Sequence, residues 1–207
     1  MNNKFNEIYY ILRQDSIFEE FSVDPSESAS NLDYDYEELI FGTKPLYFEL
    51  EIEDLNELVE EYVFLYDGPS FLVNTKLKSL IDFGLYQSQF FPAVITDEVG
   101  NSREDFWVLN TFGMLDSLND NESSIRPSHD DSSSADDLVM AKSVLRYSLD
   151  EKVLSLIPEQ ERLIFKMGNT STQPIFVHQK IVDIFQKNNV KGVKFFRVSD
   201  YEFGDEF

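Results

Sequence analysis

Hydrophobic and polar residues alternate strictly over residues 46–53. The even-numbered positions carry Leu, Phe, Leu and Ile, whereas the odd-numbered positions carry Tyr and three Glu. This period of two predicts a half-buried β-strand whose solvent face presents Glu49, Glu51 and Glu53. Neighbouring carboxylates on that face should be about 7 Å apart, which is twice the rise per residue.

Segments 70–95 and 174–198 share one pattern. Each has a short apolar run ending in Val, a polar residue, an amphipathic stretch with helical spacing, a Gly or Asn stop and a second apolar run with a Phe-Phe pair. The pattern predicts two similar strand–helix–strand units. His178 occupies the place of Asn74, so helix capping or surface exposure is an alternative to a ligand role for this histidine.

Further strands are predicted at residues 8–12, 105–111, 143–149 and 162–167. Together with the two units they predict an α+β fold, with a mixed or antiparallel sheet flanked by a few helices. The helical faces of the units predict six core residues: Leu77, Leu80, Ile81, Ile181, Ile184 and Phe185.

Charge is distributed unevenly along the 207 residues. The chain has 39 acidic and 17 basic residues, a net charge of −22, and residues 1–70 alone contribute −15. This asymmetry predicts an acidic N-terminal segment, 1–63, packed on an α+β core domain, 64–207. Residues 116–137 form a Ser-, Asp- and Asn-rich stretch, which we expect to be a mobile acidic insertion because it has little apolar surface.

Composition excludes several classes of function. The absence of Cys excludes disulfides, thiolate zinc sites and iron–sulfur clusters. The acidic excess disfavours direct nucleic-acid binding, which relies on Lys and Arg. No apolar run approaches the roughly 20 residues of a membrane helix, and the N-terminus lacks a signal-like apolar run. We therefore expect a cytoplasmic protein without membrane association.

Catalytic and cofactor motifs are missing from the sequence. The two histidines are His178 and His129, and His129 lies in the polar insertion without surroundings that could orient a general base. The chain contains no nucleophile elbow, phosphate-binding loop, paired-His helix or calcium-loop spacing. We expect no cofactor, no metal and no enzymatic activity.

Two acidic clusters are the candidate contacts for a basic partner. Like charges on one strand face repel by a few tenths of a kcal/mol per neighbouring pair, and no Lys or Arg lies within the predicted strand. Either a basic partner or a Lys on a neighbouring strand would relieve this repulsion. The candidate residues are Glu49, Glu51, Glu53, Asp33, Asp35, Glu37 and Glu38.

Several apolar segments of the chain share a pattern with known proteins. They are residues 70–95, 105–111 with the sequence Phe-Trp-Val-Leu-Asn, 162–167, 175–177 and 191–198 with a Gly-Val-Lys-Phe ending. Together these segments resemble one bacterial family of immunity proteins that accompany polymorphic toxins and are typified by a myxobacterial immunity protein. Residues 8–12 and 46–52 are similar to the variable front half of that family, and the polar insertion is longer and more polar than the family pattern.

The resemblance implies a small non-enzymatic inhibitor that binds and neutralises one cognate toxin, but it carries no contact residues over to this sequence. An acidic inhibitor suits a basic toxin, and toxins that act on nucleic acids are commonly basic, so a nuclease is the preferred target. Two alternatives remain open at this point. One is a DNA-mimic or anti-restriction inhibitor, and the other is a carboxylate-dependent hydrolase with a buried acidic pair.

Overall fold

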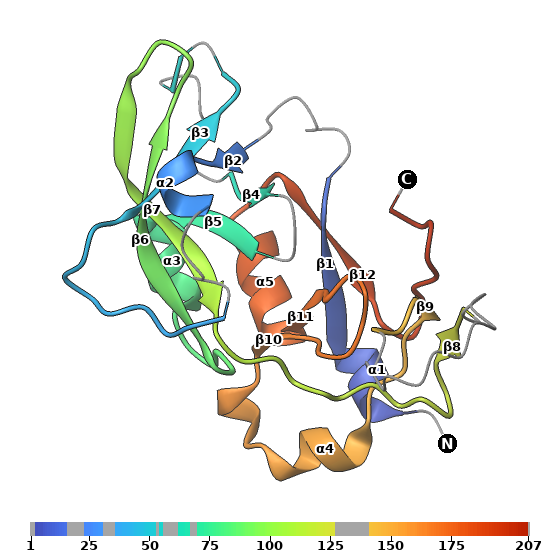
Figure 1. Ribbon diagram of the computed structural model, residues 1–207. Coiled ribbons are helices and arrows are strands. Elements are labelled where there is room, and N and C mark those ends of the chain that lie inside the picture. Colours follow the sequence, from blue (N-terminus) through green and yellow to red (C-terminus); the bar gives the residue numbers. More distant parts are fainter. Residues whose placement is uncertain are drawn as a thin grey trace, which may run out of the picture.

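The computed structural model describes residues 3–15, 23–30, 36–52, 54–55, 62–66, 70–126 and 141–206. Two larger β-sheets and several short helices make up this part of the chain, which confirms the predicted α+β fold (Figure 1). The described helices are α1 (Lys4–Ile8), α2 (Glu27–Ser30), α3 (Thr75–Ile81), α4 (Glu151–Leu156), α5 (Gln179–Lys187) and a 3-10 helix (Glu159–Glu161).

The first sheet has four antiparallel strands in the order β10-β11-β1-β12. The first strand of the chain therefore lies between two of the last. The predicted division into segment 1–63 and domain 64–207 stays a prediction, and this backbone pairing crosses it. The strands are β1 (Tyr9–Gln14), β10 (Ile164–Lys166), β11 (Ile175–His178) and β12 (Val193–Arg197).

The second sheet has six strands in the order β2-β3-β6-β7-β5-β4. It is mixed, because β3 and β6 run parallel while the other neighbours are antiparallel. A short ladder of β8 (Ser124–Ile125) and β9 (Val144–Arg146) lies apart from it. The six strands are β2 (Val23–Pro25), β3 (Leu46–Leu50), β4 (Phe64–Tyr66), β5 (Ser70–Asn74), β6 (Ser88–Thr96) and β7 (Ser102–Thr111).

The two strand–helix–strand units predicted from the sequence are present as β5-α3-β6 and β11-α5-β12. Each helix starts directly after a strand and is capped by the last strand residue. The Asn74 side chain accepts a hydrogen bond from the Leu77 N–H (2.9 Å), and His178 Nδ1 accepts one from the Lys180 N–H (3.1 Å). Helix capping, one of the two alternatives to a ligand role for His178, is therefore confirmed.

The resemblance between the units extends to their neighbouring strands. In the first unit β7 runs antiparallel between β5 and β6, and β4 flanks β5 on its other side. In the second unit β1 runs antiparallel between β11 and β12, and β10 flanks β11 on its other side. The four-strand orders β4-β5-β7-β6 and β10-β11-β1-β12 therefore correspond. They differ in chain order, because β7 follows its unit whereas β1 precedes its own by about 160 residues. The chain orders of the two four-strand sets therefore differ as in a circular permutation.

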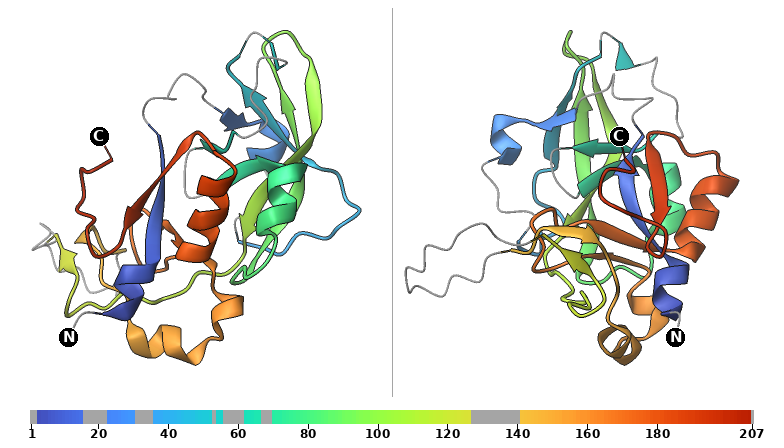
Figure 2. Two further views of the ribbon diagram at one scale, coloured as in Figure 1. Left: turned by 180° about the vertical axis from the view of Figure 1, so that it is seen from behind. Right: turned by 90° about the vertical axis from the view of Figure 1, so that its right-hand side faces the viewer.

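Three clusters of buried side chains fill the molecule. The middle cluster joins both sheets, and α3 and α5 contact each other where the sheets meet (Figure 2). The second lies on the opposite face of the six-stranded sheet and the third on the opposite face of the four-stranded sheet. Leu77 and Ile81 of α3 and Ile181 and Phe185 of α5 lie in the middle cluster, as predicted.

Two sequence-based expectations are wrong. Leu80 is 37% exposed, because the short α3 turns just its i, i+4 pair Leu77 and Ile81 toward the core. Ile184 of α5 is partly buried and packs against the middle cluster, so its predicted core position is confirmed in part. Residues 116–126, the first half of the insertion predicted to be mobile, are tied to the core. Leu118 is buried, the Asn119 N–H donates to the Ser148 carbonyl (2.8 Å), and the Asp150 N–H donates to the Ser117 carbonyl (2.7 Å). Residues 127–137 lie outside the described residues.

Candidate functional site

The outward face of β3 presents the carboxylates predicted from the sequence. Burial alternates along the strand as expected, with Tyr47 and Glu49 exposed between buried Leu and Phe side chains. The ladder ends at Leu50, earlier than predicted, and Glu51 follows it as an exposed residue. Glu53 lies outside the described residues, so its place in this face stays a prediction.

The strands beside β3 carry no positive charge. The register places Asp24 of β2 opposite Glu49 on one side and Thr96 of β6 opposite it on the other. Neither β2 nor β6 contains a Lys or Arg. The alternative that a lysine on a neighbouring strand relieves the repulsion is therefore wrong for Glu49. The residue directly across the ladder from Glu49 on β2 is thus a second carboxylate and not a counter-charge.

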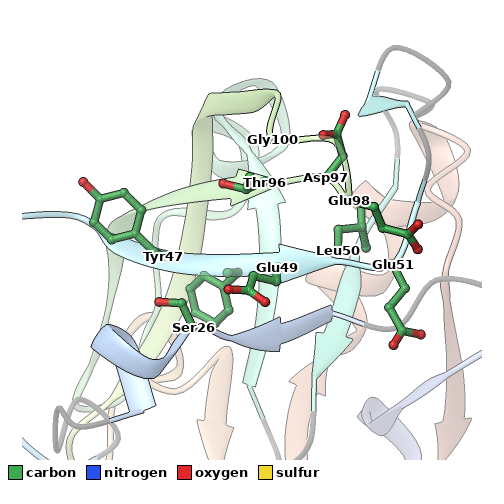
Figure 3. Close-up of a pocket in the computed structure, with 10 residues that line it drawn as sticks. Ser26, Tyr47, Glu49, Leu50, Glu51, Thr96, Asp97, Glu98 and Gly100 are labelled. Carbon is green, nitrogen blue, oxygen red and sulfur yellow. The ribbon is translucent and has the colours of Figure 1, made fainter.

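An open groove of about 650 Å³ runs along this face (Figure 3). Its wall combines β3 with the turn between β6 and β7, which the Glu98 N–H joins to the Ile52 carbonyl (3.2 Å). We call it the acidic groove and define it by Tyr47, Glu49, Glu51 and Glu98. None of its lining residues is basic, and within the described part of the chain no ion pair reaches its three glutamates.

Asp97 fixes the turn that closes the groove. Its buried carboxylate accepts hydrogen bonds from the backbone N–H groups of Leu55 (3.3 Å), Val99 (3.2 Å) and Asn101 (2.7 Å), and from the Asn101 side chain (2.9 Å). Burial by itself would raise the pKa of this carboxyl, but these hydrogen bonds hold it below its usual value. Gly100 has φ +91°, a conformation that glycine adopts without steric cost. Asp97 therefore shapes the turn and adds a fixed negative charge.

A second hollow, of about 500 Å³, adjoins the acidic groove, and Tyr47 lines both. It lies between β3, Phe91 of β6 and the 36–45 segment, which covers the face of the sheet opposite α3. Glu37 and Glu38, two members of the second predicted cluster, line this hollow and are exposed. The structure thus brings parts of both predicted clusters to neighbouring hollows.

Asp33 and Asp35 lie outside the described residues, so their part in the site stays a prediction. Sequence reasoning missed Glu98 and the dual position of Tyr47. The stretch from Asp97 to Asn101 carries a turn signal, but only the parallel pairing of β3 and β6, which is not local in sequence, places that turn beside Glu49.

His178 has a structural role. Its Nδ1 atom caps α5, and its Nε2 atom lies 3.8 Å from a carboxylate oxygen of Glu159, which also pairs with Lys180. Burial lowers the pKa of the His178 ring, with Glu159 opposing that shift. His129 lies outside the described residues. Within the described ranges no three His, Asp or Glu side chains are grouped to hold a metal, and no helix is long and apolar enough to cross a membrane.

The chain matches no protein-family model and no curated protein sequence. The resemblance to the immunity-protein family therefore remains a prediction, and the function must be argued from the two hollows and their charges.

Proposed function

We propose that this chain is a non-enzymatic immunity protein that binds and neutralises a cognate basic toxin through the acidic groove. The supporting observation is the row of exposed carboxylates at Glu49, Glu51 and Glu98, set in a groove without a basic lining residue. A cationic surface docked there would relieve a repulsion that folding leaves in place. The net charge of −22 would also speed association with such a partner.

The same features argue for a protein partner over nucleic acid, a membrane or a small substrate. A carboxylate-lined groove repels phosphates. General acid–base hydrolysis needs two carboxyls in unequal, largely buried surroundings, whereas Glu49, Glu51 and Glu98 are exposed and the buried Asp97 is engaged by four N–H groups. We propose the cytoplasm as the compartment, since the chain has no Cys.

The test uses the C-terminal domain of the protein encoded next to the gene for this chain, which we expect to be the cognate toxin. We expect nanomolar or tighter binding, measured by stopped-flow kinetics at low and high salt, together with inhibition of the activity of that domain, nuclease activity first. The triple variant Glu49→Lys, Glu51→Lys, Glu98→Lys should associate at least about 10-fold more slowly at low salt and lose most of its salt dependence.

A matched control carries three charge reversals at exposed sites on other elements: Glu151→Lys, Glu161→Lys and Asp183→Lys. It has the same net charge as the groove variant and should associate faster. Equal rates for both variants would show that only the total charge matters. Equally tight binding of the wild type to unrelated nucleic-acid enzymes would instead indicate a DNA mimic.

A further inference from the structure

Large apolar side chains are exposed on the 36–45 segment and on β3 at Tyr47, the residue that lines both hollows. Ile40 is 75% exposed, Phe41 60% and Tyr36 65%, and Tyr47 between the two hollows is 40% exposed. Ile40 and Tyr47 line the second hollow, and Tyr36 and Phe41 lie on the same segment as Ile40. Single exposed apolar residues are ordinary on protein surfaces, but a group of them at a hollow is typical of an interaction site.

The 36–45 segment, which carries Tyr36, Ile40 and Phe41, is anchored to the sheet by hydrogen bonds to its backbone. The Asn110 side-chain amide donates a hydrogen bond to the Glu37 carbonyl, and the Gln89 amide donates one to the Leu39 carbonyl, both at 2.9 Å. Beyond these two anchors, both the backbone N–H and the hydroxyl of Thr43 donate to the Ile40 carbonyl, which makes a turn. The segment is therefore held on the sheet while its turn points Ile40 away from the core.

The hollow beneath this turn is large enough for a side chain of a partner. It measures about 500 Å³ and has apolar walls from Ala29, Leu39, Pro45 and Phe91. The rim next to it is charged. Glu37 and Glu38 line the hollow, three glutamates line the adjoining groove, and Lys44 is the one basic residue among the described residues that line either.

We propose that this hollow receives an aromatic or aliphatic side chain of the basic toxin, and that Lys or Arg residues on both sides of that side chain reach the neighbouring glutamates. The proposal deepens the proposed function and rests on it. Charge complementarity selects this occupant. The hollow is apolar and its rim carries glutamates, so it fits an apolar side chain that is surrounded by Lys or Arg on the surface of the toxin. An apolar anchor surrounded by a polar rim is the usual energetic centre of a protein interface.

The test compares two kinds of variant with the same toxin domain. Ile40→Ala and Tyr47→Ala should raise the dissociation rate at least about 10-fold, and this effect should persist at high salt, because it removes packing and not charge. The groove variant with Glu49, Glu51 and Glu98 reversed should act mainly on the association rate. Leu156→Ala on α4 is the control, because Leu156 is 85% exposed and lies away from both hollows.

The outcomes show whether the proposed function fails or only the apolar contact fails. If the wild type does not bind the toxin domain, the proposed function fails and this inference fails with it. If the groove variant slows association while Ile40→Ala and Tyr47→Ala dissociate like the wild type, the proposed function stands and the apolar contact is overturned. The hollow could instead receive a side chain from a second copy of this chain, and sedimentation of the protein alone tests that alternative. A dimer that Ile40→Ala converts to a monomer would assign the hollow to a second copy and overturn the inference.

Discussion

Gln89 and Asn110 face each other across β6 and β7, and both donate a side-chain amide N–H to a carbonyl of the 36–45 segment. Two residues paired across β6 and β7 thus hold the 36–45 segment, which itself forms no β-ladder with the sheet. Asn110 is fully buried, yet its Oδ1 atom has no hydrogen-bond partner among the described residues. Such an unpaired oxygen costs stability, so we infer that this asparagine serves to hold the segment.

The double variant Gln89→Ala, Asn110→Ala should therefore act locally. We expect faster amide hydrogen exchange and faster proteolysis within residues 36–45, because two anchoring hydrogen bonds are lost. The free energy of unfolding should fall by no more than about 2 kcal/mol, since each net hydrogen bond contributes about 1 kcal/mol. The control Gln186→Ala on α5 should leave hydrogen exchange within residues 36–45 at the wild-type rate. The same wild-type rate in the double variant would contradict the role of the two amides.

The helices α3 and α5 offer a test of the middle core. Ile81→Ala and Ile181→Ala should each lower the free energy of unfolding by about 2–5 kcal/mol, because both side chains are fully buried between the sheets. Leu80→Ala should cost less than about 1 kcal/mol, since Leu80 is largely at the surface. Urea unfolding measures the free energy of unfolding of all three variants. If Leu80→Ala lowers it as much as Ile81→Ala does, Leu80 and not Ile81 faces the core.

The polar insertion should divide into a required part and a replaceable part. Replacing residues 127–140 by a short Gly/Ser turn should change the melting temperature by only a few degrees, because β8 and β9 pair on either side and loop-closure cost depends weakly on length. Leu118→Ala in the first part should lower the free energy of unfolding by about 2 kcal/mol or more. Calorimetry would contradict this division if the shortened variant lost its cooperative transition.

Stability should depend on His178 in mildly acidic solution. Burial lowers the pKa of this ring in the folded protein, with opposing charge effects from Glu159 and Asp183 and supporting ones from Lys180 and Arg162. The unfolded chain takes up a proton below about pH 6.5, so it binds more protons than the folded state in that range. The contribution of His178 is therefore complete above about pH 6.5 and is lost as the pH falls through the lower folded pKa.

The variant His178→Asn isolates this effect. An asparagine keeps a capping oxygen, as Asn74 does in α3, but has no charge to gain. Urea unfolding at pH 7.5 and pH 5.5 should show a smaller difference for this variant than for the wild type. The other histidine provides the control, because His129→Asn should retain the wild-type difference. If His178→Asn shows the same difference in stability between pH 7.5 and pH 5.5 as the wild type, the pH dependence belongs to other groups.

Local patterns in the sequence predicted local structure well. The alternation through β3 and the two strand–helix–strand units follow from side chains that are neighbours in sequence. The insertion of β1 between β11 and β12, and the parallel pairing of β3 with β6, depend on contacts between distant segments, so no short window contains them. For this reason Glu49 and Glu51 were predicted as a site, whereas Glu98 and the apolar hollow needed the structure.

The position of β1 imposes an order on folding during protein synthesis. The four strands from β4 to β7 are contiguous in sequence, so they can pair as soon as residue 111 has left the ribosome. In the described chain β1 pairs only with β11 and β12, and these strands are synthesised about 160 residues later. At translation rates of about 5–20 residues per second, β1 must wait roughly ten seconds or more for a partner. The apolar strand β1 is therefore without its described partner strands until β11 and β12 have been made, so a chaperone that covers apolar segments would protect it in the nascent chain.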